Sequence, residues 1–189
     1  MSPGNKEETF LLRLAPDLER ELPIVILKGS KQQIASFVML GDVELNVRCA
    51  QLLVDKFKSE GLLERFDMLA AIEAKGIALV HETARVLGHP YFVVIRKTVK
   101  RYMVNPMMVP VTSITSSGEQ TLVLDGRDVE RMRGRRICLV EDVIVTGGSI
   151  QAASDLVRYA GAEITVIATV LLKGEVDDPR LVYLRRPSL

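Results

Sequence analysis

The chain has 189 residues, 48% of them hydrophobic and 26% charged, which is the size and composition of one soluble globular domain with a sizeable core. The formal net charge of +1 excludes a global attraction to nucleic acid or to an anionic membrane, so any recognition of a phosphate must be local. With 5% aromatic residues and no Trp, a stacking surface for single-stranded nucleic acid is also excluded.

Residues 1–66 are predicted to form a small N-terminal hood and a first helix. The hood reads as an irregular cap with one short strand, Ile24–Leu27, and a second apolar run, Ile34–Leu40. Asp42 is a suitable N-cap for a helix that ends at Phe57. The apolar residues at helical spacing are Val43, Val47, Ala50 and Val54.

Residues 67–189 are predicted to form an α/β core that starts with a strand–turn–helix–strand unit. Met68–Ile72 is a continuous apolar run, typical of a strand that is buried on both faces. The turn Glu73–Gly76 leads into a helix over Ile77–Leu87, and Tyr91–Ile95 is the next strand.

The same order of elements returns later in the chain. Its parts are the strand Ile137–Val140, the glycine turn Thr146–Ser149, the helix Ile150–Ala160 and the strand Ile164–Leu172. Two such units predict an α/β fold with a mostly parallel central sheet flanked by helices. Ligands of such sheets bind beyond the carboxyl ends of the strands, where both glycine turns are expected.

The second turn has the chemistry of a ribose 5-phosphate site. Glycines and the free amides at a helix start suit a phosphate, and the hydroxyls of Thr146 and Ser149 can donate as well. Glu141 and Asp142, just upstream, would repel a bare polyphosphate but suit the hydroxyls of a sugar or a divalent cation. The alternative is an ordinary turn between a strand and a helix, with two surface acids.

The whole segment from Ile137 to Ser149 resembles the ribose-5-phosphate-binding signature of type I phosphoribosyltransferases: an apolar strand, two acids, a short apolar run and Thr-Gly. Ile72–Ile77 and Val94–Lys97 are similar to the pyrophosphate-binding turn and a basic strand end of the adenine and xanthine (purine) group. The resemblance extends from about Asp67 to Leu172. It implies an enzyme that transfers ribose 5-phosphate from phosphoribosyl pyrophosphate (PRPP) to a nucleobase and releases pyrophosphate, with adenine-like salvage expected.

The resemblance also implies roles for individual residues. Glu141 and Asp142 would be catalytic and bind the ribose 2- and 3-hydroxyls, and Val143 would lie against the base. The 5-phosphate would be held by Val145, Thr146, Gly147, Gly148 and Ser149. Pyrophosphate would be held by Lys75, Gly76, Arg96, Lys97 and Lys100. Mg²⁺ would be bound mainly by oxygens of the substrate, with no metal ligand assigned to the protein, and a homodimer is expected.

The segment between Thr98 and Leu122, where the family has a mobile loop, departs from this pattern. Adenine-specific members carry a Glu there, whereas this chain has Thr115 or Ser116 near that place. The alternative hypothesis is therefore a non-catalytic regulatory protein that binds PRPP or a nucleotide on the same fold. The apolar stretch Met103–Val109 predicts packing in the core or in a homodimer interface. Which nucleobase is used does not follow from these residues.

The remaining features predict structure rather than chemistry. Cys49 and Cys138 have apolar neighbours, typical of buried free thiols in a reducing compartment. No signal-peptide pattern opens the chain, and no apolar run approaches the roughly 18–20 residues of a membrane span. We therefore expect a cytoplasmic protein without membrane or nucleic-acid partners. The basic run 131–136 follows several acids, which indicates a neutralised surface loop, and His81 and His89 lack metal-ligand spacing.

Overall fold

The computed structural model describes residues 8–26, 31, 33–111 and 120–187. The chain divides into two compact units, Met1–Val38 (with Leu189) and Met39–Ser188. The assignment of residues 1–66 to a hood stays a prediction.

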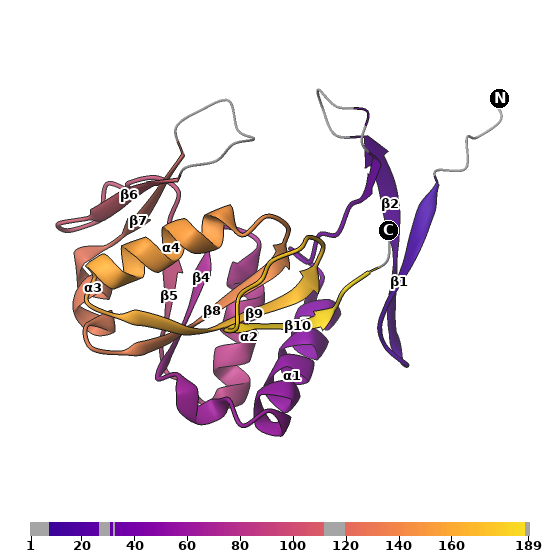
Figure 1. The fold of residues 1–189 in the computed structure, drawn as a ribbon, viewed down its shortest axis with the longest axis horizontal. Coiled ribbons are helices and arrows are strands. Elements are labelled where there is room, and N and C mark those ends of the chain that lie inside the picture. Colours follow the sequence, from indigo (N-terminus) through magenta and orange to yellow (C-terminus); the bar gives the residue numbers. More distant parts are fainter. Residues whose placement is uncertain (1–7, 27–30, 32, 112–119, 188–189) are drawn as a thin grey trace. The chain divides into compact units, whose positions relative to one another are not determined.

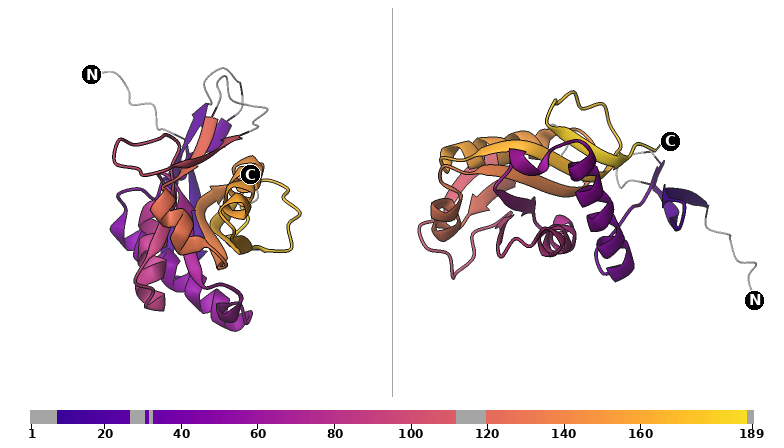
Figure 2. Two further views of the ribbon diagram at one scale, coloured as in Figure 1. Left: turned by 90° about the vertical axis from the view of Figure 1, so that its left-hand side faces the viewer. Right: turned by 90° about the horizontal axis from the view of Figure 1, so that it is seen from below.

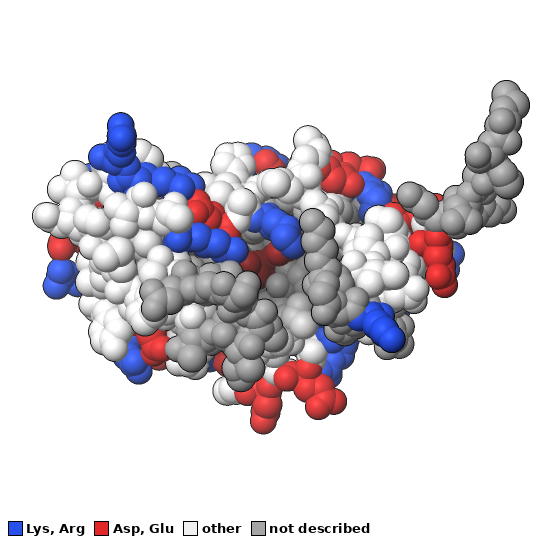
Figure 3. All heavy atoms as spheres, turned by 90° about the horizontal axis from the view of Figure 1, so that it is seen from above, with Lys and Arg blue, Asp and Glu red and all other residues white. Residues whose placement is uncertain are grey.

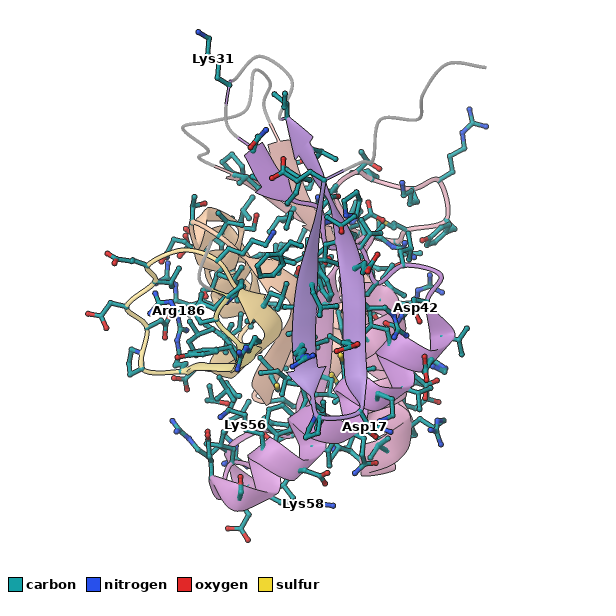
Figure 4. The ribbon with its side chains drawn as sticks, turned by 90° about the vertical axis from the view of Figure 1, so that its right-hand side faces the viewer. Asp17, Lys31, Asp42, Lys56, Lys58 and Arg186 are labelled. Atoms are coloured by element: carbon teal, nitrogen blue, oxygen red, sulfur yellow. The ribbon has the colours of Figure 1, made fainter. Side chains whose placement is uncertain are left out.

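The first unit contains a β-hairpin that the sequence analysis missed. β1 (Thr9–Ala15) and β2 (Leu18–Ile26) are antiparallel, and β3 (Gln33–Ala35) pairs with β2. Asp17 lies in the tight turn between β1 and β2 (Figure 4). The described part of the predicted strand, Ile24–Ile26, is the end of the longer β2, whose first half was hidden by its charged residues, and Leu27 lies outside the described residues.

The second unit is built on a five-stranded sheet in which every neighbouring pair is parallel, which confirms the predicted fold class (Figure 1). The spatial order is β10 (Leu181–Arg185), β9 (Glu163–Leu172), β8 (Arg136–Ile144), β4 (Met68–Ile72) and β5 (Phe92–Ile95). β10 was not predicted. A separate antiparallel pair, β6 (Met107–Val111) and β7 (Gln120–Leu124), contacts the end of β5 through a bridge between Arg96 and Val123.

Helices cover both faces of this sheet (Figure 2). α1 (Val43–Ser59) and α2 (Gly76–Leu87) pack together on one face, and α4 (Gly148–Tyr159) lies on the other. α3 (Gly126–Met132) and a short 3-10 turn (Leu63–Arg65) complete the helices of the described part. Because of this double cover, every residue of β4 is buried, as its continuous apolar run predicted. None of the helices in the described part of the chain is long and apolar enough to cross a membrane.

The predicted N-cap of α1 is confirmed, and the predicted apolar face is right in part: Ala50 and Val54 are buried, whereas Val43 and Val47 are not. The Asp42 carboxylate accepts a hydrogen bond of 2.9 Å from the amide of Leu45, and the helix continues two residues past Phe57. Val43 is 75% exposed. The buried face is made of Leu45, Asn46, Cys49, Ala50, Leu53, Val54 and Phe57. Val43 is the first residue of the helix.

The basic run 131–136 is neutralised, as predicted, and it spans the end of α3, the turn 133–135 and the first residue of β8. Arg131 pairs with Asp128 at 2.9 Å and Arg133 with Glu130 at 2.8 Å. Arg136 holds Asp67 at 2.7 Å, so its charge ties the start of β8 to the residue before β4. The pairs leave this run with little net charge to attract nucleic acid.

Candidate active site

The site lies where the parallel strands β4 and β8 end side by side. β8 was predicted to end at Val140, but it continues to Ile144 because its backbone pairs with β9 as far as Leu172. The two acids are therefore part of a regular strand rather than of a loop. A strand holds their carboxylates in fixed directions, which a loop would not.

Gly76 lets the start of α2 approach β8 closely. A Cβ at this position would lie 3.0 Å from the carbonyl oxygen of Val140 and 3.2 Å from the Ala71 Cβ. It would also lie 3.6 Å from Glu141 Oε1. Glycine is therefore required here for packing, and the turn that precedes α2 is brought to the end of β8.

Glu141 is bound to the neighbouring strand. Its Oε1 accepts a hydrogen bond of 2.7 Å from the amide of Ile72, the last residue of β4. Burial raises the pKa of Glu141 to about 8. The Ile72 amide and the charges of Lys97 and Lys75 oppose this rise, and the charge of Asp142 adds to it. The burial of Glu141 and these neighbouring groups thus control its protonation state.

Asp142 is 4% exposed, and Lys75 Nζ lies 3.4 Å from its Oδ2. This oxygen has no hydrogen-bond partner among the residues that the structure describes. A buried carboxylate oxygen without a donor is costly, so the position suits a ligand that brings hydroxyl groups or a cation. The Lys75 side chain is 52% exposed and can move.

The predicted phosphate cradle is a real pocket. A cavity of about 180 Å³ is lined by Glu141, Val143 and residues 144–150. Gly147 has φ +75°, a left-handed conformation that favours glycine, and α4 begins at the next residue. The first amides of a 12-residue helix, with its partial positive charge, therefore border this cavity. The arrangement is suited to bind an anion.

A segment after β9 that the sequence analysis did not consider packs against the backbone of the predicted phosphate turn. A Cβ at Gly174 would collide with the carbonyl oxygen of Val145. Val176 lies 3.6 Å from the Cβ position of Gly147. The Gly174 carbonyl accepts a hydrogen bond of 2.7 Å from Arg186, which Figure 4 labels. This segment thus supports the backbone that would hold the phosphate.

Lys173 is the cation that the prediction omitted. Burial and the charge of Lys75 lower the pKa of Lys173, and the charge of Asp142 opposes that change. The signal was present in the sequence. Lys173-Gly174 follows an apolar strand just as Lys75-Gly76 does.

The remaining predicted cations lie at the end of β5. The Glu73 carboxylate accepts hydrogen bonds from the Lys97 amide at 2.8 Å and from the Arg96 guanidinium at 3.1 Å. Burial would raise the pKa of Glu73, but these two donors outweigh it and hold the pKa below its usual range. Lys100 Nζ donates to the Thr98 hydroxyl at 2.7 Å. Arg96 also lines a second cavity of about 320 Å³, together with Tyr102 and Arg127, so its guanidinium is the least free of the predicted pyrophosphate ligands.

On the face drawn in Figure 3, acidic side chains lie recessed between basic ones. Such a mixture suits a ligand that carries both hydroxyls and phosphates. Residues 113–119, with the Thr115 and Ser116 positions, lie outside the described residues. Within the apolar stretch, Val109 is buried and Met107 packs against the core, while Val104 and Met108 are more than half exposed.

Comparisons with known proteins agree with this geometry. Residues 44–183 match the family model described as the phosphoribosyl transferase domain. A relative named HGPRTase-like protein 3, from Haloterrigena turkmenica, is 35% identical over 168 residues, 88% of this chain and 84% of its own. A hypoxanthine/guanine phosphoribosyltransferase from Methanothermus fervidus is 32% identical over 151 residues, 80% of this chain and 76% of its own.

The fold is also that of solved purine enzymes. An adenine phosphoribosyltransferase from Saccharomyces cerevisiae, solved with an imino-altritol bisphosphate and adenine, superposes with a TM-score of 0.70 at 18% identity. The superposition covers 87% of this chain and 94% of that one. This likeness concerns the fold, whereas the family model and the 35% identity extend to the sequence. The chain therefore belongs to the phosphoribosyltransferase family, enzymes that transfer a pentosyl group, within its purine branch.

Proposed function

We propose that this protein transfers ribose 5-phosphate from PRPP to a purine base and releases pyrophosphate. The observation that carries the proposal is the buried Asp142 carboxylate, whose Oδ2 has no hydrogen-bond partner in the described structure, beside an anion cradle at the start of α4. Acceptors for hydroxyls and donors for a phosphate are thus held side by side, which is the pattern of a phosphorylated ribose.

The ribose and its 5-phosphate occupy the end of β8 in this proposal. Glu141 and Asp142 accept hydrogen bonds from the 2- and 3-hydroxyls. The phosphate is held by backbone amides and by two hydroxyls, from Val145, Thr146, Gly147, Gly148 and Ser149. Support comes from the left-handed Gly147 and from the start of α4, whose first residues line the cavity.

Pyrophosphate is held by the cations around the neighbouring strand ends. Lys75 stands at the start of α2, where Gly76 allows the close approach to β8. Lys97 and Lys100 add positive charge from the end of β5. Arg96 binds pyrophosphate either while it is paired with Glu73 or after this ion pair has opened. Positive charge here stabilises the charge that develops on the departing group.

The residues present fit Mg²⁺ bound through the substrate. Magnesium is usually held by one or two carboxylates together with phosphate oxygens, and hard oxygen ligands are what Glu141 and Asp142 bring to this site. No cluster of three or more His, Cys, Asp or Glu able to hold a metal occurs among the described residues. The ion would neutralise pyrophosphate while bound mainly by oxygens of the substrate.

The reaction is a substitution at the anomeric carbon. The bond from this carbon to the pyrophosphate oxygen breaks, and pyrophosphate leaves with the electron pair. A nitrogen of the base forms the new bond and loses its proton to the departing pyrophosphate or to water. The transition state resembles an oxocarbenium ion, as in other glycosyl transfers. The chain positions the ribose at β8 and, with Val143 against the base, keeps water from the reactive carbon.

Adenine is the base that we propose first, as expected from the sequence. The relative from Methanothermus fervidus, named for hypoxanthine and guanine, makes the 6-oxopurines the alternative. Residues 1–66 as a hood over the base, a homodimer and a cytoplasmic location are further proposals that rest on the resemblance.

The test is a panel assay with purified protein, Mg²⁺ and PRPP. Adenine, hypoxanthine, guanine, xanthine, uracil and orotate are supplied one at a time, and pyrophosphate release is followed. Release with one purine, lost in Asp142→Ala, is the expected result. Turnover that survives Asp142→Ala would remove the assigned role of this residue. PRPP binding in calorimetry without any release would favour a regulatory protein instead.

A further inference from the structure

Lys75 stands at the entrance to the buried Asp142 carboxylate. Its backbone directly precedes α2, and the packing of Gly76 against β8 holds it in place. Its ammonium lies 3.4 Å from Asp142 Oδ2, while its side chain is 52% exposed and that of Asp142 only 5%. A flexible, solvated cation therefore faces a fixed, buried anion.

The other groups around Asp142 do not replace this contact. Glu141 is directed to the Ile72 amide at 2.7 Å, and the charge of Lys173 acts on Asp142 from the segment after β9. Asp142 Oδ2 itself has no hydrogen bond from the described residues. A ligand hydroxyl that binds this oxygen must therefore displace the Lys75 ammonium.

We propose that the Lys75–Asp142 contact is a specificity device that favours PRPP over ribose phosphates without pyrophosphate. The proposal rests on the function proposed above. A ligand with pyrophosphate offers the displaced ammonium a new anion, whereas ribose 5-phosphate or a mononucleotide places its one phosphate at the start of α4. Ligands without pyrophosphate break the Lys75–Asp142 contact and offer the displaced ammonium no new anion. This weaker binding also assists release of the nucleotide product.

The size of the effect follows from the exposure of Lys75. Ion pairs with one solvated partner are weak, so breaking this one costs a ligand about fivefold in affinity. The same lysine placed on pyrophosphate makes a charge-assisted contact that is worth about tenfold. Removing the ammonium should therefore move the two affinities in opposite directions.

The experiment measures dissociation constants by calorimetry, with Mg²⁺ present, for ribose 5-phosphate and for PRPP. In Lys75→Met, ribose 5-phosphate should bind about fivefold more tightly and PRPP about tenfold more weakly than in the wild type. Lys75→Arg keeps the charge and should keep the preference for PRPP. Lys97→Met is the matched control, because it should weaken the binding of PRPP and leave the binding of ribose 5-phosphate unchanged.

Variants made in Asp142→Asn separate the effect of the Lys75–Asp142 contact from a general effect of losing positive charge. In Asp142→Asn, where the contact is already gone, adding Lys75→Met should no longer improve ribose 5-phosphate binding. If Lys75→Met weakens both ligands, or leaves ribose 5-phosphate unchanged, the device does not exist, although the proposed function stands. A wild type that binds neither ligand overturns both proposals. Thermal unfolding of each variant checks that the exposed substitution leaves the fold intact.

Discussion

Glu141 Oε1 accepts a hydrogen bond of 2.7 Å from the amide of Ile72, which lies 69 residues earlier in the chain. The bond joins the carboxyl ends of β8 and β4, where the two glycine turns begin. Through this contact Glu141 Oε1 is committed to the neighbouring strand, whereas Asp142 Oδ2 has no hydrogen bond from the described residues. The two neighbouring carboxylates are therefore not equivalent.

The raised pKa of Glu141 predicts how stability depends on pH. In the folded state this pKa is about 8, against 4.5 for the ordinary group, so the folded chain binds more protons between these values. Through this residue stability is highest below about pH 4.5 and falls as the pH rises toward 8. Glu141→Gln, which still accepts from Ile72, should remove that fall and be more stable by about 1–3 kcal/mol at pH 8.

Urea unfolding of the wild type and Glu141→Gln at several pH values between 5 and 8.5 checks this. The gap in the free energy of unfolding should widen with rising pH. A constant gap across this range would show that Glu141 is ionised throughout.

Asp67 predicts the opposite dependence. Hydrogen bonds from Arg136 lower the pKa of Asp67 to about 2 from 3.8, so its contribution is present above the ordinary value and is lost as the pH falls toward 2. Both side chains are partly exposed, and Asp67→Asn should therefore cost no more than about 1 kcal/mol at pH 7. Unfolding curves at pH 7 and pH 2 should differ between the two proteins only at pH 7, and a cost that persists at pH 2 contradicts the ion-pair explanation.

Gly174→Ala should disturb the phosphate cradle from outside it. The new methyl group would meet the Val145 carbonyl, so the segment must shift, and we expect a loss of about 1–3 kcal/mol in stability with weaker binding of ribose 5-phosphate. Gly148→Ala is the control for stability, since the nearest atom to its Cβ position is 3.9 Å away. Equal stability of the two variants in thermal unfolding would mean that the Gly174 approach is not tight.

Ser149→Ala removes one hydroxyl that borders the cradle. Its loss should weaken the binding of ribose 5-phosphate by about tenfold to a hundredfold, the value of one hydrogen bond to a charged group, without lowering Tm. Calorimetry with ribose 5-phosphate measures this. Ser154→Ala, on the same helix but outside the cradle, should bind as the wild type does. Unchanged affinity in Ser149→Ala would leave the phosphate to the backbone amides.

Several elements could be predicted because their signals are local. Met68–Ile72 is an apolar run that a doubly covered strand requires, and Asp42 caps α1. The hairpin of β1 and β2 escaped because its strands carry charges on their exposed positions. β10 escaped because it is a short edge strand, whose pairing with β9 depends on contacts distant in sequence.

The sequence by itself determined the α/β class and the family, and it predicted the site segment from Glu141 to Ser149, because the signals of strands and turns lie in consecutive residues. Only the tertiary structure decided which contacts these residues make. It bound Glu141 to Ile72, set Lys75 against Asp142 and brought Lys173 and Gly174 to the site. Those relations join strands that are far apart in the chain, and only the parallel register of the sheet brings their ends together.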